Sequence, residues 1–171
     1  MDDEPASAFR EKVTLRATVV KVTDGDSLRV RHLPLLRSAP EGTLKIRLCA
    51  VDAPETAHFG NKAQPLGEAA KQFVKDKVEG RTVKVKLLSR DQYGRAVGRV
   101  TYAGGLCRLQ KKDVSEELLD AGLATVYRKG GAQYDGDLKT WDTIEARAKA
   151  NKRGIWQNNK ATVRTIIILV F

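Results

Sequence analysis

The sequence contains no apolar run that approaches the roughly 20 residues a helix needs to cross a bilayer. Its first residues, Met1 to Glu4, are acidic, whereas a secretory signal begins with a positively charged segment. Internal repeats and low-complexity segments are also missing. We therefore expect a protein that is soluble as given, without a signal peptide or a transmembrane segment, in a compartment that the sequence does not specify.

Cysteine and histidine are scarce. Cys49 and Cys107 are too few for a disulfide framework, and neither has a second cysteine or a histidine at metal-ligand spacing. His32 and His58 fall in predicted loops without an organised partner. These absences argue against a zinc centre and against histidine as a general base. We expect the cysteines to be structural and the histidines to lie on the surface.

Acidic residues are sparse from Lys71 to Lys112. This stretch has twelve Lys or Arg and three Asp or Glu, a charge of +9, while the whole chain carries +10. Such a field concentrates polyanions, of which nucleic acid is the commonest large one. A solvated basic face without a partner is the alternative interpretation.

Hydrophobic periodicity predicts five strands and three helices in a chain long enough for one domain. The strands are expected over residues 13–22, 27–31, 44–51, 82–88 and 96–102, and the helices over residues 66–78, 114–121 and 138–152. A helix between the third and fourth of five short strands suggests an oligonucleotide-binding (OB) barrel. The expected fold class is α+β, mainly β: a five-stranded OB-fold barrel with three helices.

The two ends of the chain are expected to lie outside this domain. We assign residues 1–12 to an N-terminal extension, residues 13–157 to the domain, and residues 158–171 to an apolar C-terminal tail. The tail is too short to span a membrane, and packing on the chain's own surface is its simplest role. An added strand, a buried flap, a partner-docking segment and a truncated reading frame are the alternatives. Membrane association is possible only through this tail.

Five charged residues offer the parts that phosphodiester hydrolysis requires. Asp26 and Asp52 lie at strand ends, where two carboxylates can converge on a hard cation. Glu55 follows Asp52 across a proline and can accept a proton from an attacking water. Arg47 and Arg95 come from different elements and can grip phosphate oxygens bidentately.

Arg47 and Asp52 are five residues apart, so a regular strand would point their side chains to opposite faces. We predict a bulge between Leu48 and Val51 that brings both side chains to one site. A regular strand there would contradict the mechanism.

Each signal is weak alone, but five motifs occur in a characteristic order. They are Val22-Thr-Asp-Gly-Asp-Ser27, Ile46-Arg-Leu-Cys-Ala-Val-Asp-Ala-Pro-Glu-Thr56, Asp91-Gln-Tyr-Gly-Arg95, Gly122-Leu-Ala124 and Gly154-Ile-Trp156. Over about residues 13 to 157 the chain resembles the staphylococcal nuclease-like (thermonuclease) family. It looks most similar to a eukaryotic subgroup that includes fungal probable endonucleases of mitochondrial membranes. Those proteins carry an N-terminal membrane segment, which we do not expect in this chain.

The resemblance implies a calcium-dependent nuclease that hydrolyses phosphodiester bonds of DNA and RNA, prefers single strands and leaves 3′-phosphate ends. It implies Ca²⁺ as the cofactor, nucleic acid as the partner, no obligate protein partner, and a monomer. Mitochondrial or membrane-associated placement is possible by resemblance. The implied roles are metal binding by Asp26, Asp52 and the carbonyl of Ala53, catalysis by Arg47, Glu55 and Arg95, and substrate binding by Tyr93 and Tyr127.

Two other functions stay open. A non-catalytic nucleic-acid-binding OB-fold module would bind without metal and without Glu55, and a scaffold would dock a partner or membrane through the apolar tail. The intact set of five charged residues favours the enzyme, because a binding module has no use for a general base.

Overall fold

The computed structural model describes residues 12–34, 42–57, 62–104 and 110–157. Most of the predicted N-terminal extension, the apolar tail, His58 and Cys107 lie outside the described residues. The predictions made for them therefore stay predictions.

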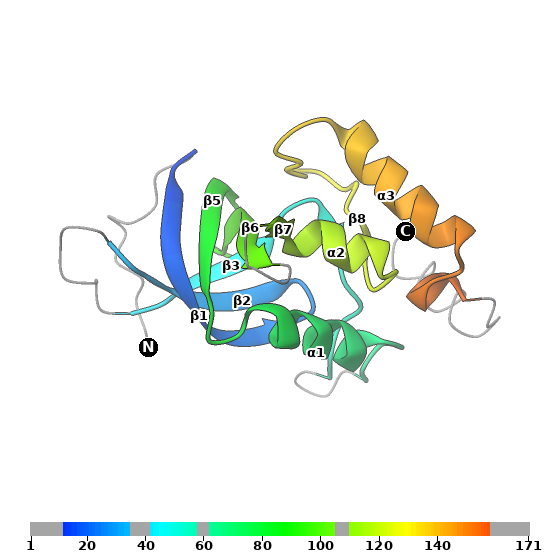
Figure 1. The fold of residues 1–171 in the computed structure, drawn as a ribbon, viewed down its shortest axis with the longest axis horizontal. Coiled ribbons are helices and arrows are strands. Elements are labelled where there is room, and N and C mark those ends of the chain that lie inside the picture. The colour runs from blue at the N-terminus through cyan, green and yellow to red at the C-terminus, as the bar shows by residue number, and fades with distance from the viewer. Residues whose placement is uncertain (1–11, 35–41, 58–61, 105–109, 158–171) are drawn as a thin grey trace.

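Five strands close into a barrel, as predicted (Figure 1). Over most of their length, β1 and β5 alternate buried and more exposed side chains, as in a closed barrel with a filled interior. Neighbouring strands run antiparallel except where β3 pairs in parallel with β6 and closes the ring. The fold is an OB barrel of α+β class. Its strands are β1 (Thr14–Asp24), β2 (Ser27–His32), β3 (Leu44–Leu48), β5 (Thr82–Arg90) and β6 (Ala96–Gly104).

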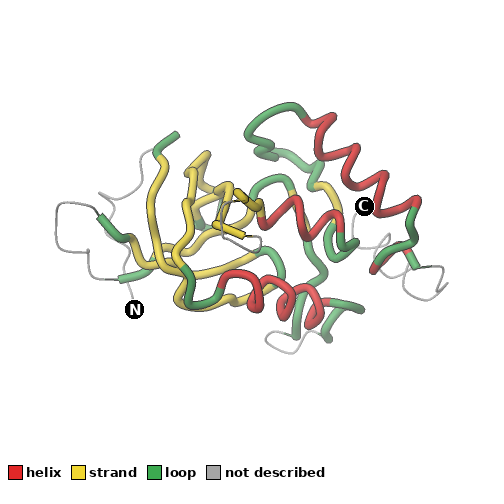
Figure 2. Tube along the Cα trace, in the orientation of Figure 1, coloured by secondary structure: helices red, strands yellow, loops and turns green. Residues whose placement is uncertain are grey.

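Three helices accompany the barrel, again as predicted. Helix α1 (Gly67–Val78) lies between the third and fourth barrel strands in the sequence and packs against β1. Helices α2 (Val114–Asp120) and α3 (Leu138–Ala150) pack on each other, and a short 3-10 helix, η2 (Gly154–Trp156), follows. Figure 2 shows α2 and α3 on one side of the strands and α1 along the bottom. The Asp113 and Asp137 side chains cap α2 and α3.

The predicted third strand, residues 44–51, is not continuous. β3 ends at Leu48, and Cys49 and Ala50 form a turn in which Ala50 has a φ of 64°. The chain then leaves the barrel as β4 (Val51–Asp52), which pairs with β8 (Thr125–Val126). The irregularity predicted between Leu48 and Val51 is confirmed, as a turn with a change of partner rather than a bulge.

The sequence patterns also missed β7 (Gln110–Asp113), which pairs with the outer edge of β6. Its residues are mostly polar, so no apolar alternation marks them as a strand. The core fills the barrel and includes Cys49, as expected of a structural cysteine. Burial raises the pKa of the Cys49 thiol to about 12, so the thiol stays neutral.

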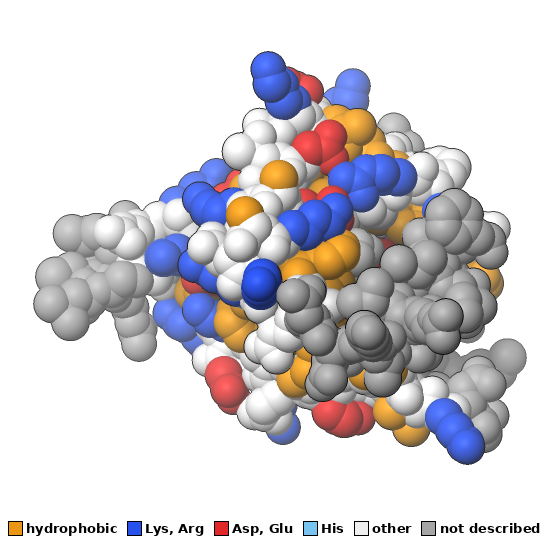
Figure 3. All heavy atoms as spheres, turned by 90° about the vertical axis from the view of Figure 1, so that its right-hand side faces the viewer, with side chains coloured by type: hydrophobic (Ala, Val, Ile, Leu, Met, Phe, Trp, Pro, Cys, Tyr) orange, Lys and Arg blue, Asp and Glu red, His pale blue; other side chains and the backbone are white. Residues whose placement is uncertain are grey.

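The face that carries α3 mixes charges of both signs. Figure 3 views this side and shows Lys and Arg side chains beside Asp and Glu. Arg147 and Arg153 both pair with Asp120 at 2.8 Å, and Arg128 pairs with Asp142. In the described part of the chain, no helix is both long and apolar enough to cross a membrane.

Candidate active site

The tight turn between β1 and β2 brings acidic groups to one end of the barrel. Asp24 Oδ1 accepts hydrogen bonds from the amides of Gly25 at 2.8 Å and Thr56 at 3.3 Å. A Cβ atom on Gly25 would lie 2.7 Å from Ala53 Cβ and 2.9 Å from Ala70 Cβ. Only glycine therefore lets this turn pack against both the loop that follows β4 and helix α1.

Arg47 joins the two carboxylates that were predicted to bind metal. Its Nη2 atom lies 3.2 Å from Asp26 Oδ2 and 2.6 Å from Asp52 Oδ1. The turn after β3 makes this possible, because Asp52 no longer continues the strand that carries Arg47. The guanidinium also stacks on the ring of Tyr127, with Cζ 4.7 Å from the ring centroid. Arg47 and the two carboxylates therefore face the same site.

Arg95 is fixed at the tip of the β5–β6 hairpin. Its Nε donates to Asp91 Oδ2 at 2.7 Å, and Asp91 Oδ1 accepts from the amides of Tyr93 and Arg95 at 2.9 Å. Arg95 Nη1 donates to Ser27 Oγ at 3.2 Å, and that hydroxyl donates to Asp26 Oδ1 at 2.8 Å. A continuous chain of polar contacts therefore connects Arg95 to Asp26.

The loop that carries Glu55 is held by its backbone. The Glu55 amide donates to Gln64 Oε1 at 3.2 Å, and the Gln64 amide donates to the Glu55 carbonyl at 2.9 Å. A Cβ atom on Gly67 would lie 2.4 Å from that carbonyl oxygen, so the start of α1 packs directly on the loop. The backbone of Glu55 is anchored, while its side chain reaches the surface.

Glu55 stands among three other carboxylates. Partial burial raises its pKa to about 8, helped by a hydrogen bond with Asp24 and by the negative charges of Asp24, Asp26 and Asp52. A carboxyl group with a pKa near the working pH can exchange protons efficiently. The position therefore suits a general base, as the sequence predicts.

Two cavities meet at Arg95. One, of about 280 Å³, is lined by Arg47, Tyr93, Arg95 and Tyr127 among others. The other, of about 300 Å³, is lined by Glu55 and Arg95 among others. The two arginines and the two tyrosines named from the sequence thus face a common space, and Tyr93 is 76% exposed. Arg95 lines both cavities, so a phosphate bound to it would lie at the border between the cavity of Arg47 and the cavity of Glu55.

The donor set at Asp26 and Asp52 suits a hard cation. Both supply carboxylate oxygens, and the carbonyl of Ala53 follows directly in the chain. Burial raises the pKa of Asp26, although the charge of Arg47 opposes the shift. Among the described residues no cluster of three or more His, Cys, Asp or Glu side chains could hold a metal ion. Two carboxylates and a carbonyl therefore suit a hard divalent cation in chemistry, with water needed to complete the shell.

Sequence reasoning named the two arginines, the two tyrosines and Glu55 in the cavity linings, and it missed three groups that line the same cavities and hold the site together. Asp24 holds the loop at Thr56, Asp91 holds Arg95, and Ser27 connects Arg95 with Asp26. A weak signal existed for Asp91, which lies four residues before an arginine across a Tyr-Gly turn. For Ser27 and Asp24 the partners lie far away in the sequence, so no local pattern points to them.

The comparisons with known proteins agree with this geometry. The family described as Staphylococcal nuclease homologue matches residues 45–158. An endonuclease Htp3 of Saprolegnia parasitica is 43% identical over 168 residues, which cover 94% of this chain and 78% of that protein. A probable endonuclease LCL3 of Komagataella phaffii is 40% identical over 90% of this chain and 74% of that protein. Another, of Eremothecium gossypii, is 50% identical over 67% of this chain and 41% of that protein. The chain therefore belongs to the staphylococcal nuclease homologue family.

Proposed function

We propose that the protein is a calcium-dependent nuclease that hydrolyses phosphodiester bonds of DNA and RNA. It prefers single strands, leaves 3′-phosphate ends and acts as a monomer without an obligate protein partner. The observation that carries the proposal is the meeting of Arg47, from β3, and Arg95, from the β5–β6 hairpin, at one cavity. Relatives named endonuclease support the same reading.

The two arginines would bind the phosphate. Each guanidinium is oriented by carboxylates, Arg47 by Asp26 and Asp52 and Arg95 by Asp91. Fixed donors of this kind stabilise the negative charge that builds on phosphate oxygens in the transition state, at no cost of reorganisation. Tyr93 and Tyr127 line the same cavity and would contact the nucleotide.

Glu55 would take the proton from the attacking water. The water oxygen forms a bond to phosphorus, the bond from phosphorus to the 5′-oxygen breaks, and that oxygen leaves with a proton as a hydroxyl. The phosphate then stays on the 3′ side. Asp26, Asp52 and the Ala53 carbonyl would hold calcium, which supplies positive charge to the phosphate oxygens when bound.

A non-catalytic nucleic-acid-binding module is the remaining alternative. Such a module would need the arginines and tyrosines but not Glu55. Burial and the charges of neighbouring carboxylates raise the pKa of Glu55, which favours proton transfer and contributes nothing to the binding of a polyanion. Calcium-independent binding without cleavage would favour the module.

A calcium-titrated digestion tests the proposal. Single-stranded DNA, double-stranded DNA and RNA are incubated with the purified chain, and the product ends are analysed. We expect cleavage that requires calcium, that is fastest on single strands, and that yields 3′-phosphate and 5′-hydroxyl ends. Absence of cleavage in calcium would overturn the proposal, and 5′-phosphate ends would overturn the assigned direction of attack.

A further inference from the structure

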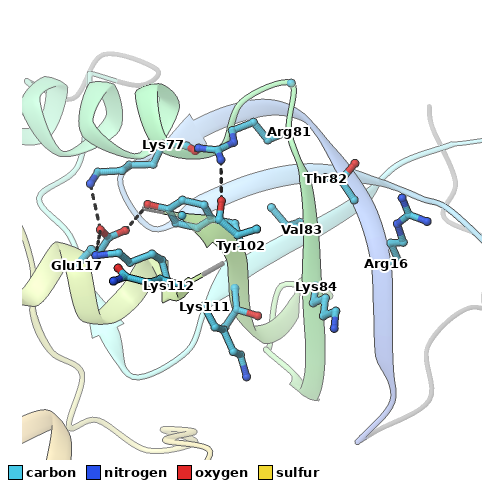
Figure 4. A pocket seen from close by; sticks show the side chains of 15 residues that line it. Arg16, Lys77, Arg81, Thr82, Val83, Lys84, Tyr102, Lys111, Lys112 and Glu117 are labelled. Atoms are coloured by element: carbon cyan, nitrogen blue, oxygen red, sulfur yellow. Dashed lines mark hydrogen bonds and ion pairs between the residues drawn. The ribbon is translucent and has the colours of Figure 1, made fainter. Parts of the chain in front are cut away.

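A larger hollow lies at the open end of the β5–β6 hairpin, away from the candidate site. It measures about 1240 Å³ and is bounded by β1, α1, β5, β6, β7 and α2 (Figure 4). We name it the basic groove, because its described lining carries six cations and a single acid. These are Arg16, Lys77, Arg81, Lys84, Lys111 and Lys112, with Glu117.

One wall of the groove is a structural network. Glu117 lies 3.1 Å from Lys77 and 3.9 Å from Lys112, and it accepts a hydrogen bond from the Tyr102 hydroxyl. Arg81 stacks on the Tyr102 ring, with Cζ 4.9 Å from the centroid. The single acid is thus already neutralised by its neighbours, and Figure 4 shows these contacts gathered on one side.

The other cations of the groove have no such role. The side chains of Arg16, Lys84 and Lys111 are exposed, and none forms a salt bridge or hydrogen bond with another residue in the described ranges. Arg16 and Lys84 stand directly opposite each other on β1 and β5. Like charges in that position repel and weaken a sheet, so the fold tolerates a repulsion that a bound anion would remove.

We propose that the basic groove binds the phosphate backbone of a nucleic-acid strand whose scissile phosphate occupies the candidate active site. Thr101, in the groove lining, follows Arg95 by six residues, a separation of roughly 20 Å at about 3.3 Å per residue. Lys86 lies two residues beyond Lys84 on the same face of β5, but it pairs with Asp135, so the charge of the groove that is unpaired in the described ranges is that of Arg16, Lys84 and Lys111. A single strand of several nucleotides would reach from one to the other.

An anionic membrane surface fits the groove less well. The large apolar side chains that are exposed in the described part of the chain are Val20, Leu66 and Tyr93, and none of them lines the groove. A concave cationic surface whose described lining includes no exposed large apolar side chain matches a polyanion strand. That the polyanion is nucleic acid rests on the proposed function.

Two triple variants test the groove at equal loss of charge. The first is Arg16→Gln with Lys84→Gln and Lys111→Gln. The control is Lys21→Gln with Lys139→Gln and Lys152→Gln, which replaces exposed lysines outside the groove lining. Affinities for labelled single-stranded DNA of about two and about twenty nucleotides are measured without calcium, by fluorescence anisotropy over a range of salt. Circular dichroism verifies the fold of each variant.

We expect the groove variant to bind the long strand at least about tenfold more weakly, with a salt slope shallower by about 2. The control variant changes the affinity less than about threefold, and the short strand, which cannot span both sites, binds all three proteins equally. Equal losses in both variants, or an equal loss for the short strand, would overturn the inference. So would reduced adsorption to phosphatidylserine vesicles with unchanged affinity for the long strand.

The same variants separate this inference from the proposed function. If the wild-type chain cleaves nothing but the groove variant alone loses long-strand affinity, the nuclease proposal fails and the groove stands. If calcium-dependent cleavage is found and the groove variant has an unchanged KM for the long strand, the groove inference fails and the nuclease stands.

Discussion

The two ends of the β5–β6 hairpin hold their positive charges differently. At the tip, Arg95 donates to Asp91 at 2.7 Å and has a second contact at Ser27. At the open end, Arg16 and Lys84 face each other across β1 and β5 without an acidic partner in the described ranges. A guanidinium with two fixed contacts can hold a reacting phosphate in one geometry, whereas an unpaired cation attracts any phosphate that comes near. The comparison predicts that the tip controls the chemical step and the open end controls affinity for long strands.

The largest expected effect comes from Glu55→Gln, because Glu55 lines a cavity together with Arg95 of the hairpin tip. This change keeps the size of the side chain and removes the proton acceptor, so the hydrolysis rate should fall roughly 10²- to 10⁴-fold. Glu68→Gln, at an exposed glutamate in the first turn of α1, is the matched control and should retain full activity. Steady-state cleavage of single-stranded DNA measures both. A loss smaller than tenfold in Glu55→Gln would remove this residue from the base role.

Arg47→Lys should lower kcat by on the order of 10²- to 10³-fold, because an ammonium cannot span two phosphate oxygens. The control comes from the open end. Arg16→Lys should leave both cleavage and long-strand binding unchanged, since charge alone is used there. Equal losses of kcat in Arg47→Lys and Arg16→Lys would contradict the distinction between the two ends of the hairpin.

Asp91→Asn should lower kcat about tenfold, because a charge-assisted hydrogen bond that orients Arg95 is weakened. Asp91 does not touch the phosphate in this scheme, so KM should change little. The hydrogen bonds from Arg95 and from the amide of Tyr93 hold the pKa of Asp91 below its ordinary value, although burial opposes them. A pure loss of affinity, with kcat intact, would contradict a positioning role.

Without calcium, the stability of the folded chain should depend on pH through Glu55 in a predictable direction. The pKa of Glu55 is raised from 4.5 to about 8, so the folded chain keeps a proton that the unfolded chain loses. Stability from this group is therefore present at low pH and is lost as pH rises through the window toward 8. Urea melts at intervals of pH should show this decline in wild type relative to Glu55→Gln, and parallel curves would disprove the shift.

The smallest expected effect is a gain in stability at the open end. Lys84→Gln removes the repulsion with Arg16, so the free energy of unfolding should rise by roughly 0.2–1 kcal/mol. Asp91→Asn at the tip should change stability in the opposite direction, because it weakens paired contacts. Urea denaturation of the three proteins measures both signs. A destabilised Lys84→Gln would mean that this lysine has a structural partner.

Much of the barrel was predictable because several of its strands alternate buried and exposed side chains. In β5, the buried Val83 and Val85 alternate with the exposed Thr82 and Lys84, and α1 buries Ala70 and Val74 at helical spacing. The strands β4, β7 and β8 could not be predicted in this way. They are short or polar, and their existence depends on the partner that each one pairs with.

The sequence by itself determined the order of the five barrel strands and three helices and named the five charged groups that could carry the chemistry. Local patterns suffice for both, because periodicity and turn residues act over a few positions. Only the tertiary structure decided that Arg47 reaches Asp26 and Asp52. It also decided that Ser27 connects Arg95, 68 positions further along the chain, to Asp26. Those contacts depend on the turn at Cys49–Ala50 and on barrel closure between β3 and β6, which no local pattern encodes.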